Sequence, residues 1–277
     1  MTISLYTFVR NGLKLDFHVL QMLRHHLPLV DEVIVNEGCS TDGTFERVSS
    51  IDPKIKVFRS EWGEQRTMDW YCQFKNDARK RCTGDWCVYL DCDEFIPEWQ
   101  FDALKSRLEH STDDLLAIDV LNFYGNYRVL HARPEKVHWA SRKIAIHRNR
   151  PDVEFWGDAS NVRVSGRPLV WPERPYDFCC HHFGYVRHAS RLRQKWRSQN
   201  AIYSKGRWRL PIPGFMFDLF PHRWDDPAFF GDLAIYDGPY IRPVMDDPDE
   251  FVRDGLSTYE ALRSHAARSA PETAATP

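Results

Sequence analysis

The feature that most constrains the fold is the alternation of β-rich runs with amphipathic stretches over the first hundred residues. Residues 2–8 and 32–36 are rich in β-forming side chains, and residues 15–27 between them have a helical pattern. A short β-rich run at 56–59 and helical spacing within 64–81 continue the alternation. Strands alternating with helices build a doubly wound sheet, which binds ligands at the carboxyl ends of its strands. The sequence therefore predicts an α/β fold with its site at that edge.

The next run, WCVYL at residues 86–90, is apolar throughout, as is typical of a central strand covered on both faces. It ends in an acidic cluster, Asp91-Cys92-Asp93-Glu94. Carboxylates two residues apart at a strand end can point to the same side and bind a divalent cation. A cation there could neutralise charge that builds on a departing nucleotide diphosphate. An acidic pair alone is as typical of a solvated turn, but its position after a central strand favours a binding site.

Beyond this cluster, residues 115–124 and 143–147 predict further strands, and the loss of strict alternation indicates a mixed sheet. With 277 residues the chain is long enough for one catalytic unit with an appendage. We expect a nucleotide-sugar-binding domain over 1–185 and a helical, aromatic C-terminal extension over 186–263, on the acceptor side. Residues 264–277 are small and polar and predict a flexible tail.

Composition excludes some classes of function. The formal net charge of -2 gives no general signature of binding to nucleic acid or to anionic membranes. The 7 cysteines are odd in number and lack zinc-site spacing, so we interpret them as reduced thiols. Neither a positively charged, apolar leader nor a run of bilayer-spanning length is evident, so we expect a soluble, cytoplasmic protein without a transmembrane segment.

Two segments together carry a resemblance to a known family, EVIVNEGCSTDGT from residue 32 and KNDARKRCTGDWCVYLDCDEF from residue 75. They resemble family 2 glycosyltransferases of the GT-A fold, particularly small bacterial members. The resemblance covers residues 2–100 and continues more weakly to about residue 200, through HHFGYVR. It implies a Rossmann-like, mostly parallel mixed sheet with flanking helices. It also implies metal-dependent, inverting transfer of a sugar, such as a hexose, from a nucleotide-diphosphate donor, first of all a UDP-sugar, to a hydroxyl acceptor.

The resemblance also assigns site residues. The residues implied to contact the donor are Thr7, Val9, Arg10, Glu37, Asp42, Lys75 and Asp91. Arg187, in the basic segment after HHFGY, is a further candidate to meet the donor diphosphate or an anionic acceptor. Helix capping is the favoured alternative for Asp42, and an exposed helical lysine is an equal alternative for Lys75. The implied metal ligands are Asp91, Asp93 and His182, with His181 as the alternative histidine. Because imidazole suits Mn²⁺ better than Mg²⁺, a histidine ligand favours manganese.

Inverting transfer requires a base that takes the proton of the acceptor hydroxyl. Relatives often carry this base in a Gly-x-His-Glu segment, whereas the corresponding stretch here is EFWGDAS, without His-Glu. Asp158 is the first candidate and Glu154 the second. Either can equally be an ordinary loop carboxylate.

Two other functions remain open. Sugar-nucleotide nucleotidyltransferases share a related sheet, but they generally carry a Gly-rich loop after the first strand, where residues 7–14 have one glycine. The other open function is that of a non-catalytic module that binds a nucleotide sugar and lacks the base. In the extension, a basic helix at 188–203 and an aromatic stretch at 215–224 are candidates for acceptor contacts, with a solvated face and core packing as the alternatives.

Overall fold

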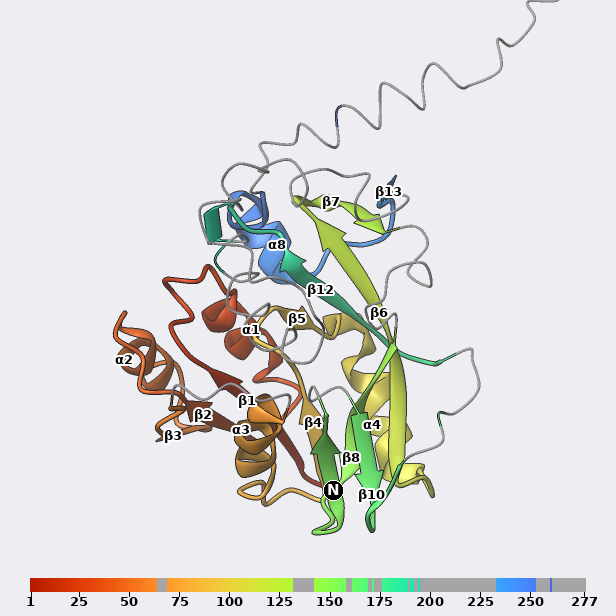
Figure 1. Cartoon of the computed structure of the whole chain (residues 1–277). Coiled ribbons are helices and arrows are strands. Elements are labelled where there is room, and N and C mark those ends of the chain that lie inside the picture. Colours follow the sequence, from red (N-terminus) through yellow and green to blue (C-terminus); the bar gives the residue numbers. More distant parts are fainter. Residues whose placement is uncertain are drawn as a thin grey trace, which may run out of the picture.

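The structure is a computed structural model in which a curled sheet is flanked by helices (Figure 1). It describes residues 1–63, 69–131, 142–157, 161–168, 171, 176–188, 190–191, 194, 233–252 and 260. Within this part of the chain, no helix has the length and apolar character needed to cross a membrane. All seven cysteines lie in it as free thiols.

Ten strands form the main sheet, ordered β13-β7-β6-β8-β4-β1-β2-β3, with β12 joined to β6 and β5 joined to β12. Their bounds are β1 Ile3–Val9, β2 Glu32–Glu37, β3 Ile55–Arg59, β4 Trp86–Tyr89, β5 Glu94–Phe95, β6 Leu115–Tyr124, β7 Asn126–His131, β8 Arg142–Arg148, β12 Cys179–Tyr185 and β13 Leu233–Ile235. The strands β3, β2, β1 and β4 are parallel to one another, whereas β8 runs antiparallel to both β4 and β6. The sheet is therefore parallel in its first half and mixed in its second.

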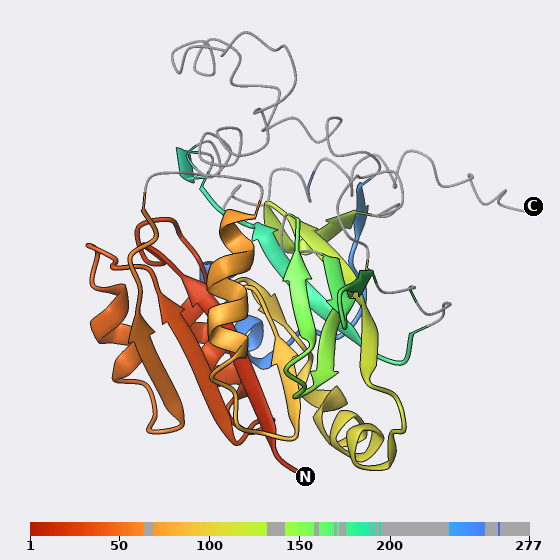
Figure 2. The ribbon, with the colours of Figure 1, turned by 60° about the horizontal axis from the view of Figure 1, so that its bottom comes forward.

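Helices cover both faces of the sheet. Their bounds are α1 Val19–His26, α2 Thr44–Ser49, α3 Trp70–Arg79, α4 Phe101–His110 and α8 Arg242–Asp246, with short 3₁₀ turns η1 Glu98–Gln100 and η4 Pro248–Phe251. Figure 2 shows α3 across the front of β1, β2 and β4, with α1 and α8 behind them. Since both faces are covered, β1, β2 and β4 are buried almost throughout, which explains why β4 is apolar along its whole length.

The predicted α/β class, a Rossmann-like mixed sheet with flanking helices, is confirmed. The expected strand at 115–124 has the bounds of β6, and those at 2–8 and 32–36 are shifted or extended by one residue in β1 and β2. The helix expected over 15–27 is shorter, because α1 begins at Val19.

A second, three-stranded sheet packs beside α3. It consists of β9 Val153–Trp156, β10 Asn161–Val164 and β11 Arg167–Pro168. The side chain of Asn76 on α3 holds the main chain of Phe155 at both polar atoms, donating to its carbonyl at 2.9 Å and accepting from its N–H at 3.0 Å. Phe155 is thereby held against the face of the main sheet that α3 covers.

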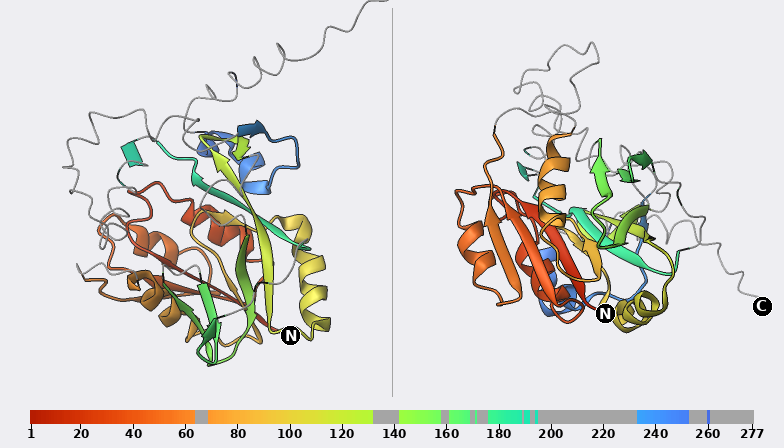
Figure 3. Two further views of the ribbon diagram at one scale, coloured as in Figure 1. Left: turned by 45° about the vertical axis from the view of Figure 1, so that its right-hand side comes forward. Right: turned by 90° about the horizontal axis from the view of Figure 1, so that it is seen from below.

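The described part of the predicted C-terminal extension packs into the main core. Strand β13 pairs with β7, and Ile241, Val244 and Phe251 are buried in the same apolar cluster as residues of α1. Figure 3 shows this C-terminal segment, in blue, beside the sheet. The domain boundary at residue 186 stays a prediction. Most of the basic helix expected at 188–203 and the whole aromatic stretch at 215–224 lie outside the described residues.

Candidate functional site

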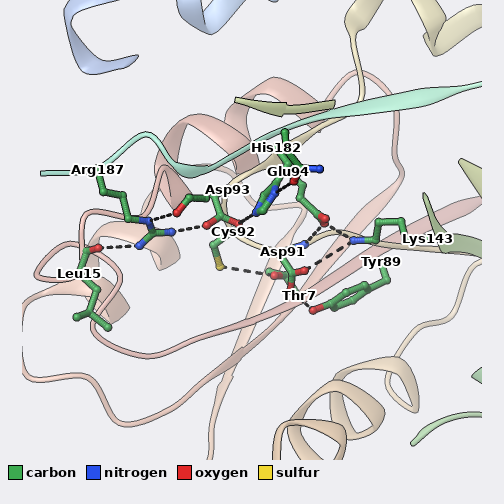
Figure 4. A network of polar contacts seen from close by, with 12 residues as sticks. Thr7, Leu15, Tyr89, Asp91, Cys92, Asp93, Glu94, Lys143, His182 and Arg187 are labelled. Atoms are coloured by element: carbon green, nitrogen blue, oxygen red, sulfur yellow. Dashed lines mark hydrogen bonds and ion pairs between the residues drawn. The ribbon is translucent and has the colours of Figure 1, made fainter. Parts of the chain in front are cut away.

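The acidic cluster follows β4 at the carboxyl edge of the parallel strands, as the sequence predicts, and its first and last members are held by a lysine from β8. Lys143 donates a hydrogen bond to Glu94 and lies 3.8 Å from Asp91 Oδ2 (Figure 4). Asp91 also accepts a hydrogen bond from Tyr89, and its side chain is half-exposed. Burial raises the pKa of Glu94 to about 7, although Lys143 acts in the opposite direction.

Asp93, by contrast, is buried between a histidine in the middle of β12 and an arginine two residues after that strand ends. Its Oδ2 accepts a hydrogen bond from Arg187 Nη2, and its Oδ1 lies 3.6 Å from His182 Nε2. The main chain fixes this arrangement, because the Phe183 N–H donates to the Asp93 carbonyl at 2.8 Å. Two of the three predicted metal ligands, Asp93 and His182, are therefore neighbours.

Arg187 joins three segments of the chain. Besides Asp93, its guanidinium donates to the carbonyls of Leu15 at 2.8 Å and of Gly184 at 3.0 Å. The same group lies 3.8 Å from the centre of the Phe17 ring, a cation–π contact. Because the side chain is fully buried with these partners, it acts as a clamp between the first loop and the acidic cluster. Its predicted contact with a donor diphosphate stays a prediction.

His182 lies in β12 between β5 and β6, opposite Glu94 on one side and Asn122 on the other. Its Nδ1 is 2.6 Å from Asn122 Oδ1. The ring also lies against Gly184, where an added Cβ would come within 2.2 Å of Nε2. The alternative ligand, His181, points elsewhere, into a buried aromatic environment that lowers its pKa to about 3 by burial and by the nearby charge of His25.

The donor set of this site suits a hard or borderline divalent cation, since carboxylate oxygen and imidazole nitrogen are both common ligands of Mn²⁺. The described residues nevertheless contain no group of three or more His, Cys, Asp or Glu side chains arranged to hold a metal ion. Asp91 is directed to Tyr89 and Lys143 instead of completing such a group. The residues thus fit a metal held by the Asp93 and His182 pair, with its other ligands supplied by substrate or solvent.

The residues predicted from the first loop have mixed positions. Thr7 is buried at the end of β1, with its hydroxyl 3.6 Å from Cys92 Sγ, and Val9 is a core residue. Arg10 follows β1 at the carboxyl edge and is half-buried. Thr7 is thus next to the acidic cluster, although it contacts the side chain between the two aspartates.

The two acidic residues predicted after β2 both organise their own loop. Glu37 is fully buried, pairs with Arg59 Nε at 2.9 Å and accepts the Ser40 N–H at 2.7 Å. Asp42 accepts hydrogen bonds from the Thr44 N–H at 3.1 Å and from the Lys14 N–H at 2.7 Å. These contacts join the first loop to the start of α2, where Gly43 is the N-cap, and a role of Asp42 towards the donor stays a prediction.

Lys75 lies inside an aromatic cage on α3. Its ammonium group is 3.3 Å from the centre of the Tyr89 ring and 3.5 Å from that of Phe155. Burial lowers its pKa well below the ordinary value, and the charge of Lys143 acts in the same direction. The alternative of an exposed helical lysine is wrong, since its exposed fraction is 3%. A contact with donor phosphates stays a prediction.

Of the two candidate bases, only Glu154 belongs to the described residues, and its carboxylate is not among the contacts of the acidic cluster. Asp158 lies outside this part of the chain. Glu154 is on β9, where Val153 and Phe155 are buried, and it therefore points to the opposite, exposed face of that strand. There its carboxylate pairs with Arg163 at 2.8 Å.

Sequence reasoning missed three residues that shape this site, Lys143, Asn122 and Gly184. Lys143 begins an expected strand, and Asn122 is a polar residue within the apolar run LLAIDVLNFY. A buried polar side chain in such a strand needs a partner, which was the available signal for Asn122. The identity of the partner depends on the pairing of β6 with β12, which local sequence patterns do not encode.

Comparisons with known proteins give distant likenesses. No family model matches the chain. A TPR repeat-containing protein of Synechococcus elongatus is 26% identical over 195 residues, which is 66% of this chain and 43% of that relative, so the chain spans less than half its length. Crystal structures of S. aureus TarS 1-349, alone and in complex with UDP-GlcNAc, have TM-scores of 0.41 and 0.42 and identities of 19% and 16%. The matches cover 73% of this chain and 66% and 68% of the TarS chains.

Proposed function

We propose that this chain is a metal-dependent glycosyltransferase that moves a sugar, with inversion, from a nucleotide-diphosphate donor to a hydroxyl acceptor. The observation that carries the proposal is the pairing of Asp93, at the carboxyl end of β4, with His182, from a strand some ninety residues later in the chain. Ligands of open α/β sheets bind at this edge, and an acidic cluster there is the chemistry expected for a diphosphate held through a cation.

Charge supports the same interpretation. Asp91, Asp93 and Glu94 concentrate three carboxyl groups at the edge where the diphosphate would bind, and a bound cation would reduce their repulsion of an anionic donor. In the proposed enzyme Asp93 and His182 hold Mn²⁺ in preference to Mg²⁺. The metal supplies Lewis-acid stabilisation of the leaving diphosphate. Asp91 is the half-exposed member of the cluster, and in the proposed enzyme it orients the donor while Lys143 holds Asp91 from β8.

The acceptor side is proposed from the sequence alone. Asp158 is the first candidate for the base, because Glu154 is paired with Arg163 on the outer face of β9. A UDP-sugar is the first donor to test. A binding module without turnover is the second candidate function, favoured by the outward position of Glu154.

The test combines binding with turnover. UDP-, GDP- and dTDP-sugars are screened by thermal shift with and without Mn²⁺, and release of nucleoside diphosphate is followed for each donor that binds. We expect Mn²⁺-dependent binding and turnover in the wild type, and loss of both in Asp93→Asn. The matched control is Asp102→Ala, which removes an exposed carboxylate on α4 and should behave as wild type.

Three outcomes decide between the functions. Donor binding without turnover would favour the binding module. Pyrophosphate release from a nucleoside triphosphate would favour a nucleotidyltransferase. Turnover that is unaffected by Asp93→Asn or by removal of the metal would refute the proposed site.

A further inference from the structure

The position of His182 is set by two residues that no motif marked, Asn122 and Gly184. His182 and Asn122 are directly opposite each other in the parallel pair β6–β12, so their side chains lie on the same face of the sheet. Asn122 is buried, and its Oδ1 lies 2.6 Å from His182 Nδ1. The contact is short, and Asn122 is 6% exposed, so water has little access to its amide.

This contact determines which ring nitrogen carries the proton. An amide oxygen can only accept a hydrogen bond, so Nδ1 must donate and must hold the hydrogen. In a neutral imidazole the other nitrogen, Nε2, then presents its lone pair. Nε2 is the atom that lies 3.6 Å from Asp93 Oδ1, so Asn122 directs a ligand lone pair towards the carboxylate.

Gly184 limits the ring from the other side. A Cβ at this position would lie 2.2 Å from Nε2 and 2.7 Å from Cε1 of His182, far inside van der Waals contact. Any other residue would displace the imidazole. The imidazole ring of His182 therefore fills the space beside Gly184, two residues further along β12, that a side chain at position 184 would occupy.

Nε2 of His182 and Oδ1 of Asp93 are 3.6 Å apart, which is longer than a hydrogen bond and is a spacing at which one cation can be bound by both atoms. Carboxylate oxygen and imidazole nitrogen are both ligands of divalent metals, and a histidine ligand is commonly fixed by a hydrogen bond at its other nitrogen.

We infer that Asn122 and Gly184 are positioning residues that hold His182 in its Nδ1–H form with Nε2 directed to a divalent cation shared with Asp93. This inference deepens the proposed function, on which the identity of the cation rests. Asn122 would hold the metal ligand His182 by a hydrogen bond without binding the metal itself. Gly184 of the HFGY segment would leave the space that the imidazole ring needs.

The experiment uses the full chain labelled with ¹⁵N-histidine. The tautomer of His182 is identified at pH 8 from its ring nitrogen shifts, with His182→Ala for assignment, and the affinity for Mn²⁺ alone is measured by electron paramagnetic resonance of the free ion. We expect the Nδ1–H form in the wild type. In Asn122→Leu that form should no longer dominate, and Mn²⁺ affinity should fall by about 10- to 100-fold.

Two further variants keep the test decisive. Asn122→Asp retains an oxygen acceptor for Nδ1–H and should keep both the tautomer and the Mn²⁺ affinity of the wild type. Gly184→Ala leaves Asn122 in place, displaces the ring and should lower Mn²⁺ affinity. It provides the second measurement if Asn122→Leu does not fold.

The inference is overturned by an Nε2–H tautomer or a fully protonated ring in the wild type at pH 8. It is also overturned if Mn²⁺ binds equally well to the wild type, to Asn122→Leu and to Gly184→Ala. These readouts are independent of turnover. Absence of transfer to any acceptor, with the expected tautomer and Mn²⁺ affinities, would refute the transferase and leave the role of Asn122 in place.

Discussion

Replacing Arg187 by methionine separates two roles for this side chain, a clamp inside the protein or a cation for the donor diphosphate. Methionine keeps an unbranched apolar stem but removes the hydrogen bonds to Asp93, Leu15 and Gly184. The Asp93 carboxylate, 3% exposed, would lose its charge partner. Breaking a buried ion pair by removing one member typically costs about 3–5 kcal/mol.

For a protein of this size, that loss corresponds to a fall in melting temperature of about 6–20 °C. We expect it in thermal unfolding followed by tryptophan fluorescence, without metal or nucleotide. The matched control is Arg24→Met, at an exposed position on α1, which should leave the melting temperature nearly unchanged. Because Asp93 and Arg187 form a pair, Asp93→Asn combined with Arg187→Met should cost less than the sum of the two single changes.

Two results would refute the clamp. One is an Arg187→Met protein whose free energy of unfolding lies within about 1 kcal/mol of the wild type, a cost typical of an exposed ion pair. The other is additivity in the double variant. An Arg187→Met protein with the stability of the wild type but weaker nucleotide binding would instead indicate that Arg187 binds the donor diphosphate, as the sequence predicts.

Two further predictions concern stability and pH. Burial acts to raise the pKa of Glu32, but hydrogen bonds from Lys56, Ser4 and Thr83 lower it from 4.5 to about 2. We therefore expect Glu32→Gln to lower the free energy of unfolding above pH 4.5 by about 1–2 kcal/mol, since Lys56 is exposed and its ion pair is screened by solvent. In urea unfolding the difference from wild type should close as pH falls towards 2, and a gap independent of pH would contradict this. His147 is buried, which lowers its pKa from 6.5 to about 4. The contribution of neutral His147 to stability is complete above pH 6.5 and is lost as pH falls to about 4. The free energy of unfolding of His147→Gln should therefore depend less steeply on pH between these values than that of the wild type. An unchanged dependence on pH would contradict this prediction.

The local parts of the fold were predictable from the sequence, and the long-range parts were not. The apolar run before Asp91 identifies a central strand, and a central strand places the acidic cluster at the carboxyl edge. The contacts of Glu37 depend on β3, where Arg59 lies directly opposite it, and no local pattern encodes that pairing. Glu154 was a plausible base by spacing, but strand alternation directs its side chain away from Phe155.

The same distinction applies to the candidate metal ligands. The HFGY segment was a sufficient signal to nominate His182, because relatives of the resembled family carry a histidine there. Asn122 could not be nominated in this way. Its importance arises only where β12 pairs with β6, sixty residues away along the chain. Periodicity predicts that both segments are strands, but it does not predict which strands pair.

The clamp made by Arg187 also has a consequence for biosynthesis. Its contact with Leu15 spans 172 residues, and its contact with Asp93 spans 94. As the chain leaves the ribosome, β1 to β4 can form their parallel sheet while Asp93 still lacks its counter-charge and His182 has not been made. Lys143 of β8 can already pair with Asp91 and Glu94, but Asp93 remains an unneutralised carboxylate until β12 and Arg187 are in place. Closing such long loops is among the slower steps of folding, so the binding site should be the last part of the sheet to mature.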